Sequence, residues 1–357
     1  MTMPTAFFFP GQASEAPAML APIMRHFPSI ASDGIDAIQH ALASDPDLPT
    51  IIRLLTNDND NDKRLLHRTA IAQPCNLLAA ILTWRVFLQT TKSADAGTGT
   101  GTTVFFGHSL GQITAFTAAG AITLVDALRI VRERGLAMEQ VTGDSNNNNI
   151  DVPSKYGMLA VSLKNQSIGE FIKVHDAADL RDDPDQVVDC ANFNSPSQVV
   201  LSGHIAALDK IAATELGQTT RKAATRYLPV RIPFHSRLLR PVESRVRAAV
   251  DNASSSITMP TSSTIHFLRN SNASPITTAD DIRDAIVSGC WQPVDWLGSV
   301  RQVHNQFGVR RWIGIGPGST ITKTLVERCL GPDRAANDIV AFDPTKPGSA
   351  WDAIAAK

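Results

Sequence analysis

The chain has 357 residues, of which 43% are hydrophobic and 19% are charged, and its formal net charge is −1. This is the composition of an ordinary globular protein, and the length exceeds what one hydrophobic core usually serves, so we expect two unequal parts. The charge balance excludes nucleic acid and an anionic membrane surface as main partners.

The N-terminal region predicts one strand and one long core helix. A strand is expected at 6–9, where Pro10 and Gly11 end it because neither continues a strand ladder easily. Helical patterns over 13–60 are weak and interrupted by prolines. From 73 to 89, apolar residues recur at helical spacing, which predicts a helix packed into the core.

A second strand and two further helices follow. The strand is expected at 103–106, and a helix of small residues follows it and ends near Gly120. Thr123 and Asp126 form a Thr-x-x-Asp start, similar to a capping box, for a helix that runs to about Val141.

An uncharged stretch, residues 104–125, is long enough to satisfy the length rule for a membrane helix. It contains three glycines and several polar residues, which would make its transfer into lipid unfavourable. A buried strand followed by a buried helix is therefore the preferred interpretation.

The polar segment 143–154 predicts a domain boundary, because it is rich in asparagine and ends near a proline. After it, strands at 157–163, 186–191, 198–202 and 225–231 alternate with helices at 166–175 and 205–216. This β-α-β-β-α-β order is that of a ferredoxin-like unit, with the middle strands joined through "NFNSPS" as a hairpin. The remaining elements are helices near 236–251, 279–289 and 319–330 and a strand at 310–315. We therefore predict an α/β protein in which 1–152 and 229–357 form the larger subdomain and 153–228 form the insertion.

The sequence "GHSLG" brackets Ser109 with two glycines between the strand and the helix. Such a Gly-x-Ser-x-Gly elbow turns so sharply that only glycine fits on either side, and it pushes the serine into a cleft. The amides of the following helix can stabilise negative charge there, but the serine still needs a base. The pattern favours a nucleophile, and a mere tight turn is the alternative.

Seven motifs occur together along the chain: "FFPGQAS" at 8–14, "GHSLGQ" at 107–112, "VRERGLAM" at 131–138, "NFNSPSQVVLSG" at 192–203, "RIPFHSRLL" at 231–239, "PVDW" at 293–296 and "GIGPGS" at 314–319. With these motifs the chain resembles the malonyl-CoA:acyl-carrier-protein transacylases, stand-alone relatives of the acyltransferase domains of fatty-acid and polyketide synthases. The resemblance spans residues 6 to about 330. It implies an α/β-hydrolase-like subdomain with a ferredoxin-like insertion.

The resemblance also implies roles for individual residues. Ser109 matches the nucleophile, His235 its general base, and the backbone N–H groups of Gln12 and Leu110 the oxyanion hole. Arg134 matches the side chain that holds the malonyl carboxylate.

Each role has an alternative in the residues themselves. A guanidinium can clamp a carboxylate with about 1.5 to 3 kcal/mol, enough to favour malonyl over acetyl. Without the resemblance, a solvated charge beside Glu133 would be the preferred interpretation of Arg134; with it, the clamp is preferred. His108 competes with His235 as the base, although consecutive side chains in an elbow diverge, so we expect His108 to point away from the cleft.

Acyl selectivity is expected from Phe234 and Leu110. In related synthase domains, a phenylalanine before the histidine and a branched residue after the serine accompany malonyl. A ring at Phe234 would also crowd an added α-methyl group.

Three positions depart from the family pattern. Ala13 replaces a usual glycine, Gln112 a usual glutamate, and Gly289 a usual glutamine whose main-chain carbonyl would orient His235. These departures concern the rate more than the chemistry.

The implied reaction is a ping-pong transfer of malonyl from malonyl-CoA to the phosphopantetheine thiol of an acyl carrier protein. No metal or redox cofactor is expected, nor any nucleic-acid or membrane partner, and we expect a monomer. An editing hydrolase for acylated carrier proteins and a starter-unit acyltransferase that uses an uncharged acyl-CoA remain alternatives, as does an inactive carrier-docking module.

Cysteine spacing and the N-terminal segment bear on the compartment. Cys75, Cys190, Cys290 and Cys329 form no CxxC pair, which predicts neither a zinc site nor disulfides. With no presequence recognised in this chain, we expect a reducing compartment, either the cytoplasm or the mitochondrial matrix.

Overall fold

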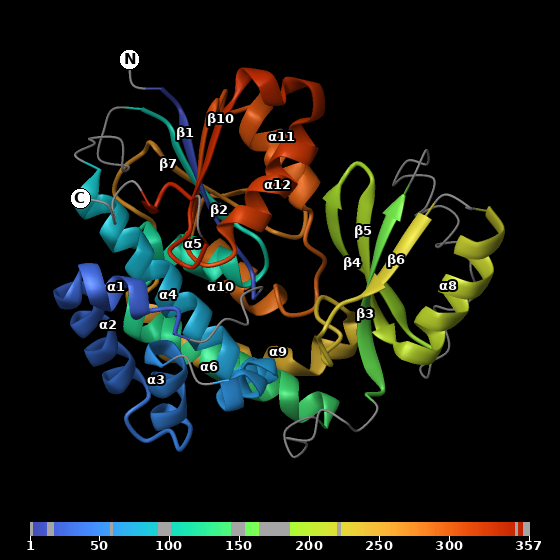
Figure 1. Cartoon of the computed structure of the whole chain (residues 1–357), viewed down its shortest axis with the longest axis horizontal. Coiled ribbons are helices and arrows are strands. Elements are labelled where there is room, and N and C mark those ends of the chain that lie inside the picture. Colours follow the sequence, from blue (N-terminus) through green and yellow to red (C-terminus); the bar gives the residue numbers. More distant parts are fainter. Residues whose placement is uncertain are drawn as a thin grey trace.

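A computed structural model describes residues 3–12, 18–57, 60–91, 101–143, 154–163, 186–219, 223–346 and 349–352. Within this part of the chain the strands form two separate sheets, one of six strands and one of four. Figure 1 shows the larger sheet among most of the helices and the smaller sheet beside them.

The apolar segments that the sequence predicts as strands, β1 (Thr5–Phe9) and β2 (Thr103–Gly107), pair in parallel at the centre of the large sheet. The order of this sheet is β10-β9-β1-β2-β7-β8, and only the β7–β8 pair is antiparallel. Its other strands are β7 (Ile265–Leu268), β8 (Pro275–Ile276), β9 (Arg311–Ile315) and β10 (Asp338–Phe342). A mostly parallel sheet needs cover on both faces, and the continuous apolar runs of β1 and β2 reflect this.

Helices cover both faces of the large sheet. On one face Phe7 and Phe105 join the core with α4 (Thr69–Thr90), α5 (Leu110–Ala118) and α6 (Leu124–Thr142); on the other, Phe8 packs with α11 (Trp296–Asn305) and α12 (Ser319–Leu330). The remaining helices are α1 (Ala21–His26), α2 (Pro28–Ala41), α3 (Leu48–Thr56), α9 (Glu243–Asn252) and α10 (Ala279–Ser288), with short 3₁₀ segments at Asp60–His67, Arg237–Val242, Ser254–Ser256 and Gly331–Ala336. The predicted α/β fold class is confirmed.

The small sheet is antiparallel throughout, in the order β4-β5-β3-β6. Its strands are β3 (Tyr156–Leu163), β4 (Val188–Ser195), β5 (Gln198–His204) and β6 (Ala223–Tyr227), and α8 (Ile205–Thr219) packs on one face. This is the strand order of a ferredoxin-like unit; its predicted first helix, at 166–175, lies outside the described residues. The other face of the sheet carries Met158, Ala191 and Val200, which pack towards Phe234.

Several elements differ from the sequence-based expectation. Strands β7 and β10 and helix α11 were not predicted, and β4 runs on through Ser195, so the hairpin turn is shorter than expected. The segment expected as one helix over 236–251 is a 3₁₀ turn followed by α9, because Pro241 lies inside its first part. Thr123 does cap α6, where its hydroxyl accepts a hydrogen bond from the Asp126 amide.

One helix, α4, has the length and apolar composition of a membrane span, but 89% of its most apolar window is buried within the protein. It passes through the core rather than along the surface, and Trp84 on it packs edge-on against Phe7 with ring centroids 4.8 Å apart. The uncharged stretch 104–125 forms β2, α5 and the start of α6, as the preferred interpretation expected.

Candidate active site

The glycine-bracketed serine forms a strained turn between β2 and α5. Ser109 has φ 54° and ψ −115°, a backbone conformation that residues other than glycine rarely adopt. A Cβ on Gly107 would lie 2.0 Å from the Gly111 carbonyl carbon, and a Cβ on Gly111 would lie 2.2 Å from the Phe9 carbonyl oxygen. Only glycine therefore fits at either position. Gly111 is required because the end of β1, at Phe9 and Pro10, lies against it, and not because of the turn at Ser109.

His235 contacts the serine directly. Its Nε2 lies 2.7 Å from Ser109 Oγ, and its Nδ1 lies 2.8 Å from the carbonyl oxygen of Gln292. A carbonyl can only accept, so Nδ1 carries the proton and Nε2 presents a lone pair to the serine hydroxyl. This is the tautomer that a general base needs.

The electrostatic surroundings keep His235 neutral. The pKa of His235 is lowered to about 3, first by burial and then by the positive charge of Arg134, and the hydrogen bond to Gln292 opposes these effects only in part. A neutral imidazole at physiological pH can accept the serine proton without first losing its own.

The carbonyl that orients His235 is not the one expected. The resemblance pointed to Gly289, but Nδ1 faces Gln292, three residues later, and the Gly289 carbonyl instead accepts from Arg134 Nη2 at 3.2 Å. Gly289 follows the last residue of α10, so its carbonyl points along the helix end towards α6. The chain has to turn through Cys290 and Trp291 before a carbonyl can reach the imidazole.

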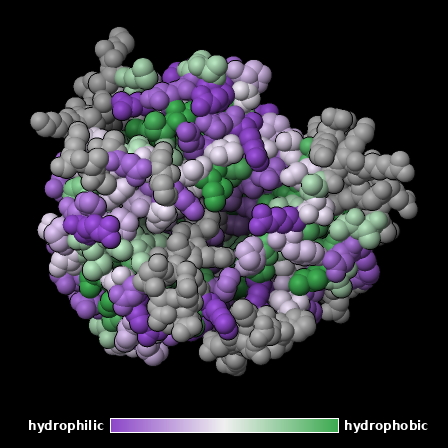
Figure 2. Space-filling model, viewed as in Figure 1, coloured by the Kyte–Doolittle hydropathy of each residue, from purple (hydrophilic) through white to green (hydrophobic). Residues whose placement is uncertain are grey.

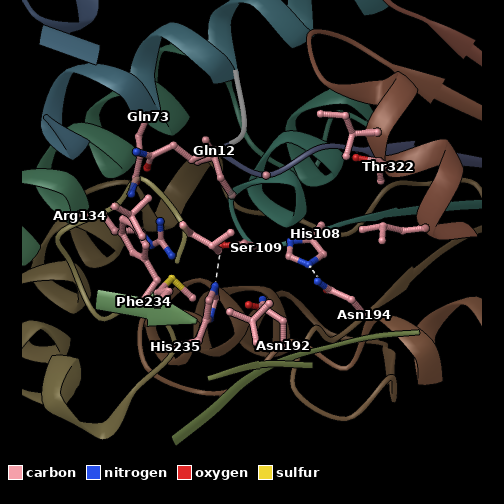
Figure 3. Close-up of a pocket in the computed structure, with 18 residues that line it drawn as sticks. Gln12, Gln73, His108, Ser109, Arg134, Asn192, Asn194, Phe234, His235 and Thr322 are labelled. Carbon is pink, nitrogen blue, oxygen red and sulfur yellow. Dashed lines mark hydrogen bonds between the residues drawn. The ribbon is translucent and has the colours of Figure 1, made fainter. Parts of the chain in front are cut away.

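His108 differs from its prediction as well. It lines the same cavity as Ser109 instead of pointing away from it, but its Nε2 bonds Asn194 Oδ1 at 2.9 Å rather than the serine hydroxyl. Burial lowers the pKa of His108. Figure 3 shows the two histidines on different sides of the serine, with the short contact made by His235 alone.

Arg134 is buried on α6, with 3% of its surface exposed, so it is not a solvated surface charge. Its neighbour Glu133 turns away and pairs with Arg245 at 2.8 Å. In the described part of the chain Arg134 has no carboxylate partner, and its Nε has no hydrogen bond. A buried guanidinium without a counter-ion is costly, which indicates that an anion completes this site.

Close packing of α4 against α6 sets the position of the Arg134 guanidinium. Pro74 inside α4 has no N–H, which frees the carbonyl of Ala70, and Arg132 Nη1 donates to that carbonyl at 2.8 Å. The Ala70 amide in turn donates to Glu139 at 2.8 Å. Gly135 lies between Arg132 and Glu139 on α6, and a Cβ on Gly135 would lie 2.5 Å from the Cα of Ala70. Only glycine therefore allows the two helices to come this close.

The two residues expected to supply the oxyanion hole, Gln12 and Leu110, both line the cavity with Ser109. Leu110 is the first residue of α5, so its N–H is one of the helix donors with no partner inside the helix. Gln12 follows β1 and lines the same cavity, whereas Ala13 lies outside the described residues. Gln112, where the family usually has glutamate, donates from Nε2 to the carbonyl of Leu268 at 2.8 Å.

These groups surround a cavity of about 270 Å³ between the two sheets. Figure 2 shows a hollow near the middle of this face, and Figure 3 shows Arg134 and Phe234 on one side of Ser109 with His108 and Asn194 on the other. The small sheet contributes an apolar wall that includes Met158 and Val200. Phe234 and Leu110, expected to govern acyl selectivity, both line the cavity.

Sequence reasoning missed several residues at this cavity. Gln73 on α4 is fully buried, and its Oε1 and that of Gln12 have no hydrogen-bond partner among the described residues. A glutamine within an otherwise apolar helical stretch is the signal that could have indicated it. Asn192 and Asn194 on β4 also line the cavity. No group of three metal-ligating side chains occurs in the portion that the structure describes.

The family model for the acyl transferase domain matches residues 6–327, most of the chain. The chain belongs to the acyl transferase domain family. Among curated members, the malonyl CoA-acyl carrier protein transacylase of Escherichia coli K12 is 32% identical over 319 residues, which cover 89% of this chain and 90% of that protein.

Solved structures are similar to this chain as well. The malonyl-CoA:acyl carrier protein transacylase of Xanthomonas oryzae is 28% identical, with a TM-score of 0.77 over 100% of this chain and 99% of that one. A malonyl-transacylase in complex with its type II polyketide synthase acyl-carrier protein is 26% identical, with a TM-score of 0.73 over 95% of each chain.

Proposed function

We propose that this protein transfers a malonyl group from malonyl-CoA to the phosphopantetheine thiol of an acyl carrier protein, through an acyl intermediate on Ser109. The observation that carries this is the arrangement around one cavity: a serine 2.7 Å from a neutral histidine and a buried guanidinium without a carboxylate partner among the described residues. The names of the curated relatives support the same reaction.

In the first half-reaction, the malonyl carboxylate pairs with Arg134 and places the thioester carbonyl next to Ser109. His235 Nε2 takes the proton of the hydroxyl while Oγ bonds to the carbonyl carbon. The backbone N–H groups of Gln12 and Leu110 stabilise the oxyanion that forms. When the carbon–sulfur bond breaks, the CoA sulfur takes the proton from His235 and leaves as the thiol.

The second half-reaction repeats these steps in reverse. The phosphopantetheine thiol gives its proton to His235 and attacks the ester carbonyl of acyl-Ser109. Collapse of the second oxyanion returns the proton to Oγ and releases malonyl-carrier protein. The apolar wall of the small sheet suits the methylene segments of an arm that reaches Ser109 from the surface.

Arg134 separates this proposal from its two rivals. Neither an editing hydrolase nor a transferase of uncharged acyl groups requires a buried cation next to the acyl pocket. Each would leave Arg134 buried without compensation, which costs free energy.

The partner and the organisation follow from the same proposal. The acyl carrier protein is the proposed partner, as in the related complex. We propose a cytoplasmic protein whose small sheet belongs to an inserted subdomain over 153–228, with 1–152 and 229–357 forming the rest.

The test is an assay with radiolabelled malonyl-CoA, with and without a phosphopantetheinylated carrier protein. The proposal expects labelled carrier protein and little free malonate, and no transfer by Ser109→Ala. Rapid release of malonate without labelling of the carrier would favour the hydrolase. Transfer of acetyl faster than malonyl would favour the starter-unit transferase.

A further inference from the structure

The strained backbone at Ser109 needs an external hydrogen-bond acceptor. With φ 54° and ψ −115°, Ser109 is the N-cap residue of α5, and its N–H has no acceptor within the helix. Such conformations are unfavourable on their own and persist only where the surroundings fix them. The two flanking glycines allow the turn, but they do not supply a partner for this amide.

That partner is the side chain of Asn270. The Ser109 amide donates to Asn270 Oδ1 at 3.2 Å, although 161 positions separate the two residues. Asn270 is buried and lies just beyond the end of β7, the strand that pairs with β2. This contact occupies the Ser109 amide, which immediately precedes the Leu110 amide expected in the oxyanion hole.

The backbone of Asn270 supports the histidine side of the site. Its carbonyl accepts from the Asp295 amide at 2.6 Å, and Val294 pairs with β4 through the Ala191 carbonyl at 2.8 Å. The same short segment begins with Gln292, whose carbonyl holds His235 at 2.8 Å. Asn270 therefore lies between the elbow that carries the serine and the segment that orients the histidine.

We propose that Asn270 is a positioning residue: its side chain fixes the Ser109 backbone and its carbonyl fixes the segment that holds His235, which sets the distance between hydroxyl and imidazole. This inference rests on the proposed function, because it assumes that Ser109 and His235 carry out the acyl transfer. It requires an acceptor atom at the Oδ1 position, and it involves no contact between Asn270 and the acyl group.

The test is the single-turnover rate at which labelled malonyl-CoA acylates the enzyme, measured by rapid quench at saturating substrate. Asn270→Ala is expected to lower this rate about 10- to 100-fold, since small misplacements of reacting groups have effects of that order. The KM for malonyl-CoA should stay within about twofold, because Arg134 is untouched. Asn270→Asp keeps the acceptor, so its acylation rate at pH 8 should be within about fivefold of the wild type. At acid pH this rate should fall, because the new carboxylate raises the pKa of His235 and so favours its protonated form.

The matched control is Asn272→Ala. Asn272 is exposed in the same turn, and its Oδ1 accepts from the amide and hydroxyl of Ser274. This variant disturbs the turn without touching Ser109, so its acylation rate should equal that of the wild type even if its melting temperature falls. Where Asn270→Ala does not fold, Asn270→Ser replaces it, because a serine hydroxyl is too short to reach the amide.

The outcomes distinguish a failure of the proposed acyl transfer from a failure of the positioning role of Asn270. Ser109→Ala that still becomes labelled would overturn the proposed function itself. If Ser109→Ala is unlabelled but Asn270→Ala acylates at the wild-type rate, only the positioning role is wrong. That role is also wrong if Asn270→Asp is as slow as Asn270→Ala at every pH.

Discussion

Replacing Arg134 with methionine removes the buried charge but keeps most of the side-chain volume. The guanidinium is 3% exposed and its Nε is unpaired, so a carboxylate in the cavity would meet it with little competition from solvent. Two charge-assisted hydrogen bonds, each contributing about 1.5 to 3 kcal/mol and partly offset by desolvation of the carboxylate, give a net of about 2 to 4 kcal/mol. We therefore expect kcat/KM for malonyl-CoA to fall roughly 30- to 1000-fold.

The assay compares malonyl-CoA with acetyl-CoA as donors to the same carrier protein. Acetyl has no carboxylate, so its kcat/KM should be unchanged or should rise once the buried charge is gone. Arg129→Met is the matched control on the same helix, because Arg129 is 47% exposed and contacts Asp126 and the Ala41 carbonyl away from the cavity; its kcat/KM should stay within about twofold. A malonyl rate in Arg134→Met within threefold of the wild type, or an equal loss for both donors, would refute the reasoning.

Five further outcomes are expected. Because the pKa of His235 is lowered to about 3, kcat/KM measured by initial rates should stay level as pH falls from about 8 to 5. In Arg134→Met the positive charge that helps to lower this pKa is gone, so the pKa, and with it the acid limb of the pH profile, should move towards 6.5. The lowered pKa also makes the free energy of unfolding depend on pH: the contribution of neutral His235 is fully present above pH 6.5 and is lost as pH falls towards 3. Urea titrations at several pH values can measure this loss. Gly107→Ala should destabilise the fold by about 3 kcal/mol or more in urea titrations, because its Cβ would lie 2.0 Å from the backbone of Gly111. Arg132→Met should cost about 3 kcal/mol in thermal denaturation, because it leaves Asp45 and Asp47 without their buried partner. Phe234→Ala should raise methylmalonyl-CoA use relative to malonyl-CoA about tenfold in a competition assay, since one buried methyl group discriminates by that order.

The parts of the fold that the sequence predicts well are those with a strong local signal. The long apolar helix, the strand before "GHSLG" and the Thr123 cap depend on residues close together in the chain, and each lies near its expected position. The strands β7 and β10 are only four and five residues long and take their stability from pairing with neighbours far away in sequence. Periodicity within such a short segment does not distinguish a strand from a loop.

The same distinction applies to the site. "GHSLG" indicates the elbow because its requirement for glycine is local, and the motif "VRERGLAM" contains Arg134 as part of the family pattern. The carbonyl that holds His235 depends on how the chain leaves α10, which a motif match does not record, and so Gly289 was the wrong residue. His108 was placed by a rule about consecutive side chains, but the cavity extends around both sides of Ser109 and includes it. Gln73 and Asn270 make contacts across 65 and 161 positions, which no local pattern reveals.

Intact-mass spectrometry of the enzyme after brief exposure to malonyl-CoA, followed by peptide mapping, tests the central claim most directly. The proposed chemistry predicts a single malonyl adduct on Ser109, absent from Ser109→Ala, formed much more slowly by His235→Ala, and lost when carrier protein is added. An adduct on another residue, or full transfer to the carrier protein by Ser109→Ala, would contradict it.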